Sequence, residues 1–229
     1  MDGFDAIFPA LQATGVRYVV VGGVAVNLHG YQRFTKDVDL IVELVPKEAL
    51  RALEALQSIG YSPRIPVRMA DFADPAIRDS WIRDKGMVVF QMYNDTIHQS
   101  VDIFTSYPLD FESLWQDSVP VDLPGASPRI ASIDHLILMK QRRARPQMTT
   151  VPPPERPVIG SFEEAQLFRL RVGLELTPAQ RLRDLQEMIK FNAEAEARNP
   201  GLRWIAEQLR LNARASLSSA SLSTATPAL

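Results

Sequence analysis

The stretch that decides the fold is YVVVGGVAVNLHGYQRFTKDVDLI, residues 18–41. An apolar run leads into the pair Gly22 and Gly23, and a second apolar run carries Asp37 and Asp39, separated by a single valine. Residues i and i+2 of a β-strand share one face, so the two carboxylates project together. Burying carboxylates without partners costs free energy, and a shared cation is the simplest remedy. The stretch therefore predicts a strand, a glycine turn into a helix, and a second strand that offers a metal site.

A third acid lies where a strand should be apolar. Residues 87–92 and 100–105 are predicted strands joined by a turn-rich connection, and Asp102 stands between two apolar residues of the second strand. Carboxylates supply the hard oxygen ligands that magnesium prefers. Three of them on adjacent strands suit nucleotidyl transfer with two metal ions, which activate the attacking oxygen and neutralise the leaving oxygens. The pattern predicts a site for divalent ions, with magnesium as the metal.

The two glycines suggest a binding site for phosphate. A turn without side chains lets backbone N–H groups approach phosphate oxygens, and the N-terminus of the following helix adds its dipole. The turn is neither a P-loop, since no Gly-Lys-Ser/Thr ending follows, nor a GxGxxG dinucleotide turn. The plain alternative is an ordinary connection between a strand and a helix.

Apolar spacing and cap residues predict helices along much of the remaining chain. Asp74 followed by Pro75 combines an N-cap with a favoured first helical residue, and Thr177 opens a later helix with a capping-box glutamine at Gln180. Residues 61–74 are expected to be irregular. The predicted strands span residues 17–21, 37–43, 87–92 and 100–105, and the predicted helices span residues 4–14, 24–29, 46–59, 75–83, 110–116, 133–145 and 202–211, with a further helix from residue 178.

The C-terminal part of the chain divides by composition. The segment PQMTTVPPPERP contains five prolines in twelve residues, which excludes a helix or a central strand. The serine-rich end of the chain is low in complexity and is predicted to be disordered. The expected organisation is a globular domain at residues 1–145, a Pro-rich linker or loop at 146–160, a helical C-terminal region at 161–214 and a disordered tail at 215–229.

Composition narrows the class of protein. The 229 residues include no cysteine, which excludes disulfides, thiolate metal ligands and a cysteine nucleophile. No apolar run approaches the roughly 20 residues that span a bilayer, and the first residues are acidic, unlike a basic signal sequence. We expect a cytoplasmic protein with no membrane partner.

Charge is distributed unevenly along the chain. Residues 1–128 carry 10 Lys and Arg against 17 Asp and Glu, whereas residues 129–229 carry 15 against 10. An acidic catalytic half beside a basic half suits a metal-nucleotide site next to a polyanionic acceptor. Solvated helix faces would produce the same asymmetry.

In their order and spacing, the glycine pair, the paired aspartates and the third aspartate resemble the signature of the nucleotidyltransferase superfamily typified by DNA polymerase beta. The fuller pattern GGVAVNLHGYQRFTKDVDL, with Asp74-Pro75 and Trp81, is similar to small bacterial members related to type IV toxin-antitoxin nucleotidyltransferases. The resemblance covers residues 16–142. It implies an α+β fold, in which a small mixed β-sheet is flanked by helices and followed by a helical C-terminal region. The implied activity is magnesium-dependent transfer of a nucleoside monophosphate (NMP) from a nucleoside triphosphate (NTP) to a hydroxyl, with release of pyrophosphate.

The resemblance also implies roles for individual residues. Gly22 and Gly23 would bind the triphosphate of the NTP. Asp37 and Asp39 would hold two Mg²⁺ ions, and Asp102 would complete the metal site or take the proton of the acceptor. Further residues would contact the triphosphate, namely Arg33, Thr35 and Lys36 on the loop before the paired aspartates and Lys140 on a later helix.

Several kinds of acceptor are compatible with this implied activity. Its hydroxyl could belong to tRNA or another RNA, to a protein or to a small molecule. The chain could accordingly be a toxin with an antitoxin partner, or an antibiotic-modifying nucleotidyltransferase. A member of a different class would bind a nucleotide or a partner chain without catalysis.

Overall fold

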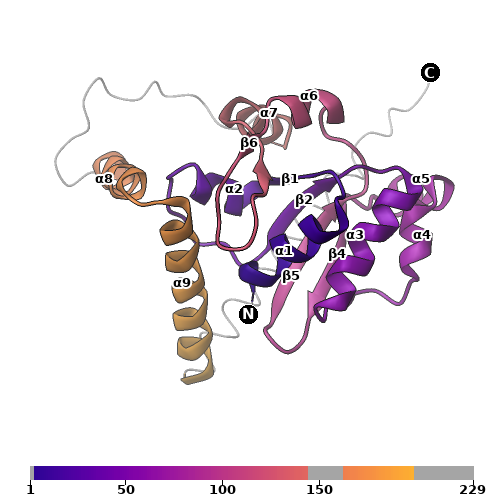
Figure 1. Cartoon of the computed structure of the whole chain (residues 1–229), viewed down its shortest axis with the longest axis horizontal. Helices are drawn as coiled ribbons and strands as arrows, with labels where there is room; N and C mark the ends of the chain where they lie inside the picture. Colours follow the sequence, from indigo (N-terminus) through magenta and orange to yellow (C-terminus); the bar gives the residue numbers. More distant parts are fainter. Residues whose placement is uncertain (1–2, 144–161, 199–229) are drawn as a thin grey trace, which may run out of the picture.

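The computed structural model describes residues 3–143 and 162–198, and these form a mixed β-sheet flanked by helices (Figure 1). The sheet has seven strands in the order β3-β4-β5-β2-β1-β7-β6. The strands are β1 Tyr18–Val21, β2 Val38–Val42, β3 Ser62–Pro63, β4 Val89–Asn94, β5 Gln99–Phe104, β6 Val119–Pro120 and β7 Arg129–Ile130. The helices are α1 Phe4–Thr14, α2 Gly22–Leu28, α3 Pro46–Ser58, α4 Met69–Ala73, α5 Pro75–Lys85, α6 Phe111–Gln116, α7 Ile133–Arg143, α8 Phe162–Glu175 and α9 Pro178–Arg198.

Both kinds of strand pairing occur in the sheet. The pairs β2/β5 and β1/β7 are parallel, whereas β1/β2, β3/β4, β4/β5 and β6/β7 are antiparallel. The predicted fold class, α+β with a small mixed sheet flanked by helices, is therefore confirmed.

Side chains alternate between the two faces of the sheet along each strand, so each face contributes to a separate hydrophobic core. On one face, residues such as Val38 and Leu40 pack against α1 and α3 in the main core, and these two helices lie in front of the sheet in Figure 1. On the other face, Val19, Ile41 and Phe104 pack beneath α6 and α7 in a second, smaller core. This second face is the one on which the paired aspartates project.

Several local predictions are confirmed. The predicted strands at residues 87–92 and 100–105 are the antiparallel hairpin β4-β5, which extends two residues beyond the predicted end of its first strand and begins one residue earlier in its second. Asp74 caps α5, because its Oδ1 accepts hydrogen bonds from the backbone N–H of Ala76 at 2.8 Å and of Ile77 at 3.3 Å. Thr177 and Gln180 form the predicted capping box of α9, with N–H to side-chain distances of 2.8 and 3.3 Å.

Three local predictions need correction. Residues 61–74 are not irregular throughout, because β3 pairs with β4 and α4 forms with a capping box between Arg68 and Asp71. Strand β2 begins at Val38, so Asp37 lies just before the strand. Helix α2 begins at Gly22, two residues before the predicted start.

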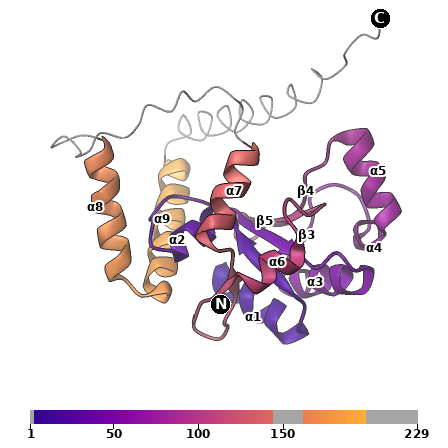
Figure 2. The ribbon, with the colours of Figure 1, turned by 90° about the horizontal axis from the view of Figure 1, so that it is seen from above.

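The C-terminal helices pack onto the sheet domain. Leu182 and Leu185 of α9 belong to the main core, and Figure 2 shows α8 and α9 beside α2, at the opposite side from α4 and α5. The predicted linker at residues 146–160, the helix at 202–211 and the tail at 215–229 lie outside the described residues. Among the helices that the structure describes, none has the length and apolar character needed to cross a membrane.

Candidate active site

The three predicted acids lie on one face of the sheet. Asp39 is the register partner of Asp102 on the parallel strand β5 and of Val21 on β1, and Gln91 of β4 is the partner of Asp102. Neighbouring strands lie about 4.8 Å apart, so these four residues form a continuous row across the sheet. Asp39 and Asp102 are both partly buried. The register therefore places two carboxylates side by side on β2 and β5, and β2 is the direct neighbour of β1, the strand that leads into the glycine turn.

The glycine turn is packed against one of these carboxylates. Gly22 has φ +64°, in the left-handed region that favours glycine, and a Cβ atom at this position would overlap the carboxylate of Asp39. A Cβ atom at Gly23 would lie only 2.6 Å from the Cβ and Oγ1 atoms of Thr35. Neither glycine leaves room for a side chain, so the backbone of the turn directly contacts the predicted metal ligand and the loop that precedes it.

The other two acids each accept a hydrogen bond from a residue that sequence reasoning missed. The hydroxyl of Ser100 donates to Asp37 Oδ1 at 2.8 Å, and the amide of Gln91 donates to Asp102 Oδ1 at 2.8 Å. Both partners stand on the β4-β5 hairpin and point to the same face as the acids. The signal for them was the alternation along the predicted strands, but only the register pairs them with particular carboxylates.

The acids share a face but do not meet at one point. Within the described residues, no three histidine or acidic side chains come close enough together to hold a metal ion as they stand. Asp39 and Asp102 are adjacent, whereas Asp37 lies one step further along the face, toward Ser100. Two partly buried carboxylates side by side are hard oxygen donors, which fits Mg²⁺. The two-ion site with all three acids stays a prediction.

The loop between α2 and β2 is attached to the glycine turn. Asn27 donates through Nδ2 to the carbonyls of Gly23 at 2.9 Å and Arg33 at 2.7 Å, and its Oδ1 accepts from the Arg33 N–H at 2.9 Å. Asn27 is 1% exposed, so this is a buried connection. It holds the predicted phosphate-binding loop next to the predicted phosphate-binding turn.

The predicted basic residues are placed differently from one another. The side chain of Arg33 is exposed, and Lys36 Nζ lies 5.9 Å from the centre of the Phe34 ring on the same loop. Lys140 is exposed on α7, and in the part of the chain that the structure describes no hydrogen bond or ion pair joins it to the acids. The structure thus connects the turn and the loop to the acids, whereas a role for Lys140 stays a prediction.

The C-terminal helices contact the start of this loop. Arg181 of α9 donates to the carbonyl of Leu28 at 2.5 Å and to that of Gly173 at 2.7 Å, and burial lowers the pKa of its guanidinium. A Cβ atom at Gly173 would overlap the carbonyl oxygen of Gly30. The end of α8 is therefore in backbone contact with the residues between α2 and the predicted phosphate-binding loop.

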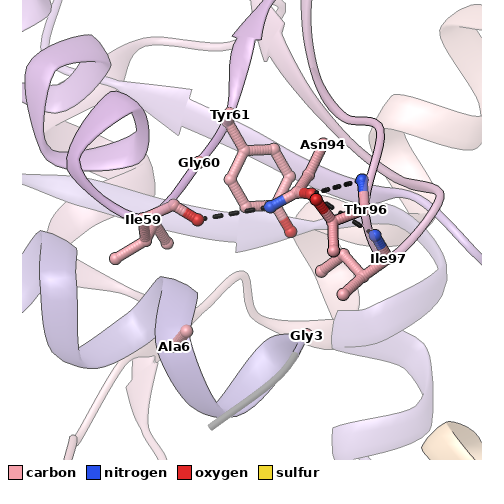
Figure 3. Close-up of a pocket in the computed structure, with 8 residues that line it drawn as sticks. All are labelled: Gly3, Ala6, Ile59, Gly60, Tyr61, Asn94, Thr96 and Ile97. Atoms are coloured by element: carbon pink, nitrogen blue, oxygen red, sulfur yellow. Dashed lines mark hydrogen bonds between the residues drawn. The ribbon is translucent and has the colours of Figure 1, made fainter.

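A pocket elsewhere on the molecule has no catalytic chemistry. It lies between the start of α1, the end of α3 and the tip of the β4-β5 hairpin (Figure 3), and none of its eight lining residues is charged. Asn94 donates to the carbonyl of Ile59 at 3.2 Å and accepts from the N–H groups of Thr96 and Ile97. These bonds fasten the hairpin to α3, so we assign the pocket a structural role.

Comparisons with known proteins find similar solved structures at low sequence identity only. No protein-family profile matches the chain, and no curated protein matches it. Among solved structures, it is similar to a proposed nucleotidyltransferase from Thermotoga maritima, at 14% identity and TM-score 0.41 over 72% of this chain and 88% of that one. It is also similar to the lincosamide antibiotic adenylyltransferase LnuA with lincomycin bound, at 13% identity and TM-score 0.39 over 70% and 89% of the two chains. A third similar structure is the antibiotic-resistance factor ANT(2″)-Ia, at 14% identity and TM-score 0.41 over 86% and 94%.

Proposed function

We propose that the protein is a magnesium-dependent nucleotidyltransferase that moves an NMP from an NTP to an acceptor hydroxyl. The observation that carries the proposal is the row formed by Val21, Asp39 and Asp102, with Gly22 pressed against the Asp39 carboxylate. A phosphate bound at the turn would lie beside two carboxylates on neighbouring strands. This is the neighbourhood that phosphoryl chemistry assisted by divalent ions requires.

Each part of the site has a distinct task in this proposal. The Gly22-Gly23 backbone and the loop carrying Arg33, Thr35 and Lys36 bind the triphosphate. Asp37 and Asp39 hold magnesium, which when bound neutralises charge on the phosphate oxygens. The acceptor oxygen forms a bond to the α-phosphorus, and the bond from that phosphorus to the bridging oxygen of pyrophosphate breaks. Asp102 accepts the proton that the hydroxyl loses and passes it to solvent.

The acceptor is RNA, including tRNA, a protein or a small molecule in this proposal. With RNA or a protein as the acceptor, the chain would act as a toxin with an antitoxin partner. With a small molecule as the acceptor, it would act as an antibiotic-modifying enzyme. These alternatives separate in a single experiment. The protein is incubated with magnesium and each of the four α-labelled NTPs, either in cell extract or with purified antibiotic, and the labelled product shows both the nucleotide and the acceptor.

The test of catalysis is the variant Asp39→Asn, which keeps the side-chain shape and removes the charge. We expect NMP transfer to fall by about a hundredfold or more, because the variant loses a charged ligand beside the phosphates. The matched control is Asp79→Asn, at an exposed position on α5, and it should transfer NMP at the normal rate. Unchanged transfer by folded Asp39→Asn protein would contradict the proposal.

A non-catalytic member of the fold would behave differently in these experiments. It would be stabilised against heat by NTP, since a ligand that binds only the folded state raises the unfolding free energy. It would release no pyrophosphate under any acceptor condition. Measuring melting temperature and pyrophosphate release on the same samples separates the two classes.

A further inference from the structure

The row of site residues extends beyond the acids to Arg64. The N–H of Arg64 donates to the carbonyl of Gln91 at 2.9 Å, which continues the β3/β4 pairing by one residue past the strand. Arg64 therefore stands next to Gln91 in the row that contains Asp39 and Asp102. Its strand position is two strand spacings from Asp102, about 10 Å. The glycine turn and Arg64 thus flank the acids from opposite sides.

Arg64 is held on an aromatic ring that belongs to the same face. Its guanidinium carbon lies 4.4 Å from the centre of the Tyr93 ring, within cation–π distance. Tyr93 is the register partner of Ser100, the residue that donates to Asp37. The Tyr93 hydroxyl also lies 3.2 Å from His98 Nδ1 at the hairpin tip. The cation–π contact, the strand register and this hydrogen bond connect Arg64, Tyr93 and His98 to the face of the sheet that carries the aspartates.

Within the described part of the chain, no carboxylate neutralises the charge of Arg64. Arg68 and Arg83, which are also exposed, each form an ion pair with a carboxylate. Arg64 is exposed and has no acidic partner in the ranges 3–143 and 162–198. Its guanidinium N–H groups remain available to bind an anion while the ring limits its movement. Such a cation beside an acidic centre fits an anionic ligand that extends away from the acids.

We propose that Arg64, Tyr93 and His98 form an acceptor subsite that binds a nucleotide unit at the end of single-stranded RNA. A nucleotide unit offers a phosphate for the guanidinium and a ring for the aromatic side chains, the combination used in single-strand recognition. The inference rests on the proposed function, which places the NTP at the glycine turn. The opposite side of the acids is then the side from which the acceptor hydroxyl arrives.

The test measures binding of a short fluorescein-labelled single-stranded RNA to the full chain by fluorescence anisotropy, without NTP or magnesium. We expect Arg64→Ala to weaken RNA binding about tenfold and to lower the slope of log affinity against log salt by about one, because one phosphate contact is lost. Tyr93→Ala should weaken binding by a similar factor, since a stacking platform is lost. The control Arg83→Ala removes the same charge from an α5 side chain that is 74% exposed, and its binding should match the unsubstituted protein.

The possible results separate the subsite from the catalytic proposal. RNA affinity equal in Arg64→Ala, Arg83→Ala and the unsubstituted protein would overturn the subsite, even if NMP transfer occurs. A raised KM for NTP in Arg64→Ala with unchanged RNA affinity would also overturn it, because the nucleotide unit would then be that of the NTP. RNA binding through Arg64 without NMP transfer under any condition would instead overturn the proposed function. Arg64 is exposed, so Arg64→Ala should fold, and a melting curve checks this.

Discussion

Gly22 is the residue on which the geometry of the site depends most directly. Its φ of +64° and its contact with the Asp39 carboxylate are separate reasons for glycine at this position. A residue with a side chain would pay about 1 to 2 kcal/mol for the left-handed conformation alone. It would also displace Asp39, which is the carboxylate nearest to the turn.

Gly22→Ala should therefore reduce both stability and NMP transfer. The matched control is Gly86→Ala, because Gly86 has φ +60° and open space within 4 Å of the added Cβ atom. Both variants carry the conformational strain, and only Gly22→Ala overlaps a carboxylate. Urea denaturation measures the loss of stability and transfer of labelled NMP measures activity. Equal losses of both quantities in the two variants would show that the Asp39 contact has no influence.

At the scale of elements, the β4-β5 hairpin supplies the partners of the acids. It contributes Asp102, and it places Gln91 against Asp102 and Ser100 against Asp37. Its tip is fastened to α3 through Asn94. Asp37, just before β2, and Asp102, on β5, thus both take their orientation from one hairpin, so the register of the hairpin sets the geometry of the face that carries the acids.

The α8-α9 pair is the second element that acts on the site. Arg181 and Gly173 connect this pair to the end of α2 and to Gly30, at the start of the loop that carries Arg33 and Lys36. This connection predicts that the C-terminal helices help to hold the predicted phosphate-binding loop.

Arg181→Ala should loosen that loop and raise the KM for NTP more than it lowers kcat. The variant loses two hydrogen bonds from a charged donor, each of which contributes about 1.5 to 3 kcal/mol. Amide hydrogen exchange of residues 30–36 should become faster, which a change confined to α9 would not produce. Arg183→Ala, at an exposed position two residues further along α9, is the control. Unchanged exchange in Arg181→Ala would contradict the connection.

At the scale of the whole molecule, the C-terminal helices share the core of the sheet domain. Leu185 is fully buried and belongs to the same cluster as residues of α1 and β2. Leu185→Ala should lower the unfolding free energy of the chain by about 2 to 5 kcal/mol. Leu167→Ala, at a position 44% exposed on α8, should change it by no more than about 0.5 kcal/mol.

Urea denaturation followed by both circular dichroism and tryptophan fluorescence measures this effect. A single shared transition that moves to lower urea in Leu185→Ala is the expected result. Two transitions, with only one affected by Leu185→Ala, would show that the sheet domain unfolds independently of α9.

The sequence by itself determined the parts that depend on neighbours along the chain. The alternation around Asp37, Asp39 and Asp102 predicted which way these side chains point, because strand periodicity is a local property. The caps at Asp74 and Thr177 were predictable for the same reason, since a cap bonds to residues two or three positions away. The site residues that were predicted are those with such local signatures.

Only the tertiary structure decided which distant segments meet. Strand register paired Asp39 with Asp102, gave Asp102 its partner Gln91 and brought Arg64 into the same row, and no local pattern encodes register between segments so far apart. The prediction for residues 61–74 was wrong for the same reason, because β3 exists only through its pairing with β4. The glycine turn was visible in the sequence, but its contact with a carboxylate required the fold.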